Sequence, residues 1–114
     1  MELYKNLAIH LMENGIDVYS ISQHQGECKE PFIVVEDKGI LNDRGYTFKI
    51  NNIDLVLYFP KGSYTKLENF INSVIDIMKK YNRAIYSKEI SDVMIDTDKN
   101  AYVVILPYKV IKTF

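Results

Sequence analysis

The chain has 114 residues, of which 47% are hydrophobic and 25% are charged, and its formal net charge is −1 at pH 7. These values fit one compact domain over residues 1–114, and the net charge gives no electrostatic reason to expect nucleic-acid binding, which usually needs a basic stripe. Cys28 is the single cysteine, which excludes an intrachain disulfide and a thiolate metal site and favours a reducing compartment.

Apolar residues at helical spacing open the chain and predict a helix over residues 1–14. Gly15 follows where a left-handed C-cap would lie. The same segment is too polar and too short for a signal peptide or a membrane span, so we expect a soluble protein of the cytoplasm. The apolar positions are Leu3, Leu7, Ala8, Leu11 and Met12.

Two β-branched, aromatic-rich runs follow and predict strands. IDVYSI predicts a short strand over 16–21, and FIVVE predicts a strand over 32–36 that is buried on both faces. The polar segments 22–31 and 37–45 contain glycine and predict loops.

Alternating apolar residues then continue from position 46 to position 59. Asn51 and Asn52 interrupt the alternation, and they are either a hairpin turn or a bulge inside one long bent strand. We favour the bulge.

Pro60-Lys61-Gly62 ends this strand, and an amphipathic helix begins immediately afterwards. Thr65 and Glu68 have the spacing of a capping box. One apolar stripe predicts the helix face that packs on the sheet. We expect Leu55, Leu57 and Phe59 to pack under three residues of that stripe, which are Phe70, Val74 and Met78.

The remaining chain predicts an irregular segment over 83–99, with a weak extended patch at 84–86, and a last strand over 101–111. Pro107 cannot donate a hydrogen bond, which places it at a sheet edge or a bulge. The order α-β-β-β-α-β predicts an α+β fold. Its sheet would be four-stranded and mainly antiparallel, with two helices packed on one face.

Three candidate chemical sites are each outweighed by a simpler interpretation. Lys61 precedes the only glycine of its corner, which a phosphate loop does not allow. His24, Glu27 and Cys28 could form a nucleophile–base pair or half of a zinc site, but a solvated loop is the simpler interpretation. The third candidate is the acidic loop with Asp92, Asp96 and Asp98, which lacks the glycine and glutamate of a calcium loop. We therefore expect no catalytic residue, no cofactor and no metal ligand set.

Two segments then carry a resemblance to a known family. ECKEPFIVV and YFPKGSYTKLENF, together with helix one and the closing strand DTDKNAYVVILPYKVIK, resemble the bacteriophage tail terminators. These tail-completion proteins cap the tube of long-tailed phages and of phage tail-like particles. The resemblance covers nearly the whole chain in the order of the family.

The resemblance implies a structural assembly protein that is not an enzyme. It implies a homo-oligomer, a hexameric ring stacked on the last ring of the tail tube protein. This ring would end tube polymerisation, present a surface to the neck or head-completion protein, and in contractile systems engage the sheath protein. Assembly would occur in the host bacterial cytoplasm, and the protein would remain in the virion or tail-like particle. Neither membrane binding nor recognition of a nucleic-acid sequence is expected.

Nine tyrosines and five phenylalanines are compatible with subunit contacts. Two other interpretations remain open: a head–tail neck or connector protein, or another small protein-binding module, and a small hydrolase or metal enzyme that uses His24 and Cys28. The residues that we expect to contact partners are Gln23, His24, Glu27, Lys29, Asn42, Asp43, Arg44, Lys61, Tyr64, Tyr102 and Tyr108.

Overall fold

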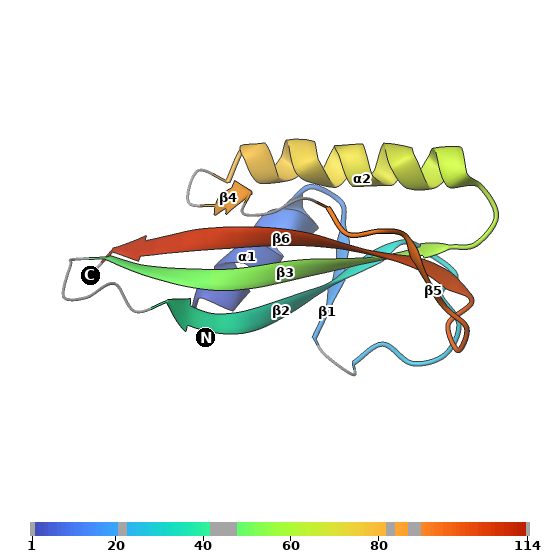
Figure 1. Cartoon of the computed structure of the whole chain (residues 1–114), viewed down its shortest axis with the longest axis horizontal. Coiled ribbons are helices and arrows are strands. Elements are labelled where there is room, and N and C mark those ends of the chain that lie inside the picture. The colour runs from blue at the N-terminus through green and yellow to red at the C-terminus, as the bar shows by residue number, and fades with distance from the viewer. Residues whose placement is uncertain (1, 21–22, 42–47, 82–83, 87–89, 114) are drawn as a thin grey trace.

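The computed structural model describes residues 2–20, 23–41, 48–81, 84–86 and 90–113. Two helices and six strands form one α+β unit. The elements are α1 (Glu2–Glu13), β1 (Asp17–Tyr19), β2 (Phe32–Leu41), β3 (Phe48–Pro60), α2 (Tyr64–Lys79), β4 (Ala84–Tyr86), β5 (Met94–Asp96) and β6 (Ala101–Thr113). In the view of Figure 1, α1 lies behind the three long strands and α2 lies above them.

The sheet has the strand order β1-β2-β3-β6-β4, and β5 also pairs with β6. Only the β1–β2 pairing is parallel, and the other pairings are antiparallel. The α+β class is confirmed, whereas the four-stranded sheet is wrong because β4 and β5 also join it along β6. These two strands have three residues each, which is too short for an alternating pattern to identify them.

Strand β2 is twice as long as predicted, and the predicted loop begins too early. The register steps from Asp37 opposite Ile53 to Gly39 opposite Asn52, so Lys38 is the extra residue of a bulge. Strand β3 runs as one strand through Asn51 and Asn52, so the expected bulge lies in the neighbouring strand instead.

One face of the sheet carries the main core, and both helices pack on it. The core contains Leu55 and Leu57 of β3 together with Val74 and Met78 of α2, as expected. The rings of Phe59 and Phe70 lie 5.5 Å apart at the edge of this core. Residues of α1 and α2 belong to the same cluster, which confirms that the two helices share one face of the sheet. The α1 and remaining α2 members are Leu7, Leu11, Leu67 and Ile71.

Local signals set the ends of both helices. Gly15 has φ +85° after α1, as the predicted left-handed C-cap requires. The N-cap of α2 is Ser63, two residues before the predicted Thr65, and its hydroxyl accepts from the backbone N–H of Lys66 at 3.3 Å. Met12 is half exposed, in contrast to its predicted place in the apolar stripe.

Pro107 lies at a stretch of β6 that is an edge. The N–H of Ile105 donates to the Ser91 hydroxyl, so the backbone groups of Ile105 face away from β3. Residues two positions apart in a strand point their backbone groups to the same side, so those of Pro107 face away from β3 as well.

On the side away from β3, β5 covers residues 101–103 and β4 covers 108–110, so no described strand pairs with Pro107 on that side, although Asp54 of β3 lies opposite it on the other. The prediction from its missing N–H is confirmed. No helix in the described ranges is long and apolar enough to cross a membrane.

Candidate functional site

Three segments that are distant in sequence meet at one end of the sheet. We call residues 23–31, 60–64 and 97–102 together the loop end. The backbone N–H of Cys28 donates to the Lys99 carbonyl at 2.8 Å, and the N–H of Lys61 donates to the Asn100 carbonyl at 3.3 Å. The Asn100 amide also donates to the Glu27 carboxylate at 3.2 Å. The turn before β6 therefore holds both the 23–31 loop and the corner that precedes α2.

The ammonium group of Lys99 fixes the 23–31 loop through three contacts. It lies 3.0 Å from the His24 carbonyl oxygen, 3.4 Å from the Gly26 carbonyl oxygen, and 3.0 Å from His24 Nδ1. Burial, and then the positive charge of Lys99, lower the pKa of His24. A neutral imidazole whose Nδ1 accepts from the ammonium satisfies this geometry.

A stack of aromatic rings lies beneath that contact. The His24 ring stacks on Phe32 with centroids 4.0 Å apart, and Phe32 stacks on Tyr58 at 4.6 Å. Tyr19 meets the edges of His24 and Phe32 at 5.0 and 5.2 Å. With Cys28 and Ala101, these rings make a second, small core on the face of the sheet opposite the helices.

The Cys28 thiol is buried and packs in the second core. It is 3% exposed, and its Sγ lies 3.2 Å from the Glu30 carbonyl oxygen, to which it donates. Burial raises the pKa of Cys28 to about 11, so the nucleophilic thiolate is scarce at neutral pH. Nδ1 of His24 faces Lys99, so this nitrogen does not serve as a base for the thiol. The arrangement gives no support to the hydrolase interpretation.

The metal interpretation of the acidic loop finds no geometric support either. Asp96 accepts a hydrogen bond from the backbone N–H of Lys99 at 3.1 Å, as a turn residue does. Asp92 and Asp98 are exposed. Within the described residues, no group of three potential ligand side chains could hold a metal ion.

The loop end gathers seven of the residues that the sequence nominated for partner contacts. Tyr64 and Tyr102 meet edge to face at 5.8 Å, and Tyr64 is 51% exposed. Tyr108 is placed elsewhere: it is 4% exposed in the main core, which gives its nomination as a contact residue no support. Residues 42–44 lie outside the described ranges, so their nomination stays a prediction. The seven are Gln23, His24, Glu27, Lys29, Lys61, Tyr64 and Tyr102.

Two hollows adjoin the loop end. One, of about 220 Å³, is lined by residues that include Asp17, His24 and Glu27. The other, of about 380 Å³, brings Lys29 of the loop together with Lys61 and Lys66 beside α2. The second hollow gives the corner before α2 a positive character.

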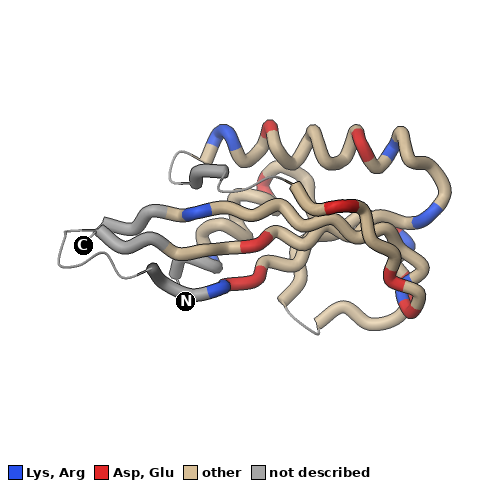
Figure 2. The backbone as a smooth tube through the Cα atoms, viewed as in Figure 1, with Lys and Arg blue, Asp and Glu red and all other residues tan. Residues whose placement is uncertain are grey.

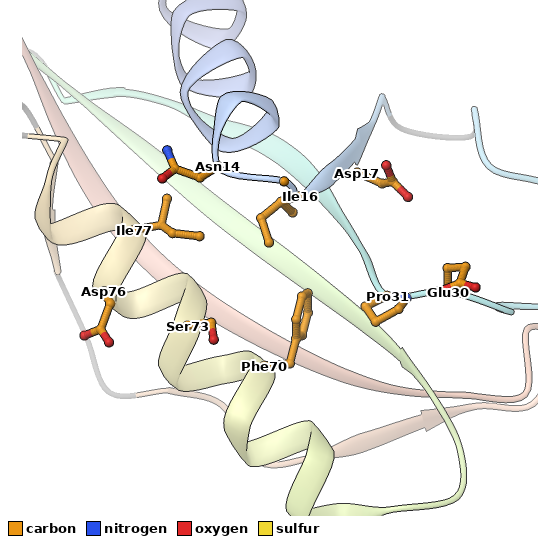
Figure 3. Close-up of a pocket in the computed structure, with 10 residues that line it drawn as sticks. Asn14, Ile16, Asp17, Glu30, Pro31, Phe70, Ser73, Asp76 and Ile77 are labelled. Carbon is orange, nitrogen blue, oxygen red and sulfur yellow. The ribbon is translucent and has the colours of Figure 1, made fainter.

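Sequence patterns missed a larger groove between the two helices. Its volume is about 580 Å³, and Figure 3 shows Phe70 and Ile77 of α2 pointing towards Ile16 across it. Its lining also includes the carboxylates Asp17 and Glu30. No local pattern could reveal it, because its lining comes from the end of α1, the start of β1, the residues before β2, and α2.

The sheet face opposite the helices, here called the open face, was also missed. Alternation along β2, β3, β5 and β6 places on it a group of apolar side chains that continues from the aromatic stack at Tyr58. None of the described helices covers this group. Its members are Val34, Val56, Tyr58, Met94, Val103 and Ile105.

No protein-family model matches the chain, and no curated protein sequence matches it.

Proposed function

We propose that this protein is a structural component of a bacteriophage tail or tail-like particle. It acts as a tail terminator, which caps the tail tube, ends polymerisation of the tube protein, and joins the tail to the neck or head. The resemblance of ECKEPFIVV and YFPKGSYTKLENF to that family motivates this proposal.

The observation that carries the proposal is the meeting of those two family-like segments at the loop end. ECKEPFIVV supplies Cys28, and YFPKGSYTKLENF supplies Lys61; both bond to the same turn before β6. Exposed polar and aromatic side chains surround these bonds, while the described part of the loop end offers neither a thiolate nor a metal ligand set. A surface of this kind suits the binding of other proteins.

In this function, copies of the chain form a ring, which is hexameric in the family that it resembles. One side of the ring contacts the last ring of the tube protein, and the other contacts the neck or head-completion protein. In a contractile particle the ring also engages the sheath protein.

Deletion of the gene from the parent phage or particle tests the function directly. Electron microscopy of lysates should show tail tubes of variable and excessive length, and the gene supplied on a plasmid should restore a uniform length. Tubes of uniform length that fail to join heads would instead identify a neck or connector protein. Unchanged particles would refute both assignments.

A matched pair of variants in the same plasmid assay tests the enzyme interpretation. His24→Ala and Cys28→Ala each remove a group that hydrolysis would need. We expect Cys28→Ala to restore uniform tails, provided that it accumulates as folded protein, because Cys28 is buried and out of reach of a partner. Loss of activity with a folded Cys28→Ala variant and an intact ring would contradict the structural role, whereas loss with His24→Ala alone would fit a partner contact at His24.

A further inference from the structure

The apolar group on the open face is continuous across four strands. Val34 lies opposite Val56, and Val56 lies opposite Ile105. In the next row, Tyr58 lies opposite Val103, and Val103 lies opposite Met94. Directly opposite side chains on one face of a sheet are in contact, so the two rows form one patch. Met94, at the outer end, is 43% exposed.

Carboxylates border this apolar patch on two sides. Glu36 and Asp54 lie opposite each other in the row that follows Val34 and Val56, and Asp96 lies beyond Met94 on β5. Figure 2 shows red segments near the middle of β2 and β3, and no charge over the right-hand parts of those strands and of β6. Burial, and then Asp96 and Glu36, raise the pKa of Tyr58, which places both negative charges near its phenol.

Only part of this negative charge is neutralised within the chain. Lys38 pairs with Glu36 at 3.3 Å, while Asp54 makes no ion pair with any residue in the described ranges. Lys109 lies on the same face, opposite Asn52 and one row beyond Asp54.

Val56 is buried within the patch and Met94 is exposed at its outer end. A partly exposed apolar surface with the carboxylates of Asp54 and Asp96 at its border is complementary to an exposed apolar side chain that is flanked by cations.

The same chain carries such a surface on the other side of the sheet. Tyr64, at the first turn of α2, is 51% exposed and packs on Tyr102, which lies on the helix side. Lys61 and Lys66 are both exposed beside it. Neither lysine forms an ion pair with a carboxylate in the part of the chain that the structure describes. We call Lys61, Tyr64 and Lys66 the basic corner.

We propose that a second copy of this chain docks its basic corner on the open face of the first. Tyr64 covers the apolar patch near Met94 and Val103, and Lys61 and Lys66 approach Asp54 and Asp96. This inference deepens the ring assembly proposed above and rests on it, because it assigns the two surfaces that join neighbouring subunits.

The placement of the surfaces determines the kind of contact. The corner and the patch are different surfaces on opposite sides of one sheet, so the contact is heterologous: each subunit offers its corner to one neighbour and its patch to the other. Repetition of such a contact closes into a ring when the rotation between subunits allows it. A contact of this kind leaves the groove between the helices free.

Sedimentation equilibrium of the full chain at low ionic strength tests the contact with two variants. The corner variant carries Lys61→Ser and Tyr64→Ser, and the patch variant carries Asp54→Lys and Met94→Lys, so the two altered surfaces offer each other no opposite charges. We expect the native chain to self-associate, and each variant to need at least tenfold more protein for half-association. The matched controls are Lys79→Ser at the other end of α2 and Met12→Lys on α1, which should stay within twofold of the native chain.

Mixing the variants identifies a heterologous contact. The corner variant keeps an intact patch, and the patch variant keeps an intact corner, so an equimolar mixture should form 1:1 dimers and no larger species. Thermal unfolding verifies that each variant is folded; if the patch variant unfolds early, Met94→Lys alone replaces it because Met94 is half exposed.

A native chain that stays monomeric at all concentrations would overturn the proposal, as would variants that associate like the native chain. These outcomes differ from failure of the proposed function. Normal tube lengths without the protein would refute the terminator role even if the contact exists. Rings that resist all four substitutions would refute the contact while leaving the terminator role intact.

Discussion

Replacement of Lys99 by methionine should destabilise the protein by about 2 kcal/mol, because the ammonium fixes the loop end. A hydrogen bond to a charged group contributes about 1.5–3 kcal/mol. Two of the three contacts are 3.0 Å long and the third is 3.4 Å. The released carbonyl groups lie close enough to the surface to bond water, so the net loss should be close to that of one such hydrogen bond, about 2 kcal/mol, and well below the sum of three. Methionine retains the apolar stem and isolates the effect of the charge.

Urea unfolding followed by far-ultraviolet circular dichroism measures this loss. We expect a lower midpoint with an unchanged m value, and a Tm lower by about 8 °C, since about 4 °C corresponds to 1 kcal/mol for a chain of this size. Lys29→Met in the same loop is the control, because Lys29 is exposed and its change should stay within about 0.5 kcal/mol. Equal losses for the two variants would refute the role of the Lys99 contact.

Three further predictions address single groups. Because the pKa of His24 is lowered in the folded chain, the unfolded chain takes up this proton at a higher pH than the folded chain does. The contribution of His24 to the free energy of unfolding is therefore fully present above about pH 6.5 and decreases as the pH falls below that value. Urea midpoints across pH 5–8 should show this decrease in the native chain and a smaller one in His24→Gln; identical profiles would contradict it. Ser63→Ala should cost about 1 kcal/mol through loss of the N-cap, whereas Thr65→Ala should cost little. Thermal unfolding compares the two, and a larger effect at Thr65 would restore the predicted capping box. Cys28 should react slowly with a thiol reagent at pH 8 and rapidly after denaturation, because burial raises its pKa to about 11. Rapid labelling of the folded protein would show that the thiol is accessible.

The sequence predicted best those elements whose patterns extend over many residues. The stripe that includes Val74 and Met78 predicted a helix packed on a sheet, and the alternation around Leu55 favoured one long strand over a hairpin. Both are found, because burial of many side chains on one face outweighs single interruptions such as Asn51 and Asn52. The Asn51 amide lies 3.3 Å from the Asp37 carboxylate, to which it donates, so the asparagine is accommodated inside the strand.

The remaining features depend on partners that are distant in sequence. Gly39 and the charges around it predict a loop, yet pairing with β3 extends β2 as far as Leu41. Thr65 has a better capping-box sequence than Ser63, but the chain leaves the sheet at Pro60 and reaches helical geometry sooner. Tyrosine composition could not separate a buried Tyr108 from an exposed Tyr64. The burial of Tyr108 depends on which face of β6 the helices cover, and the exposure of Tyr64 depends on which side of α2 packs on the sheet.

The structure of the loop end separates the atoms that hold the fold from those that are free to bind a partner. Lys61 uses its backbone N–H to bond the Asn100 carbonyl, and its exposed ammonium takes no part in that bond. Tyr64 rests one edge of its ring on Tyr102 and exposes the rest. The apolar patch begins at Tyr58 of the aromatic stack and ends at the carboxylate row of Asp54. Substitutions at the basic corner should therefore change assembly without changing stability, whereas Lys99→Met should change stability first.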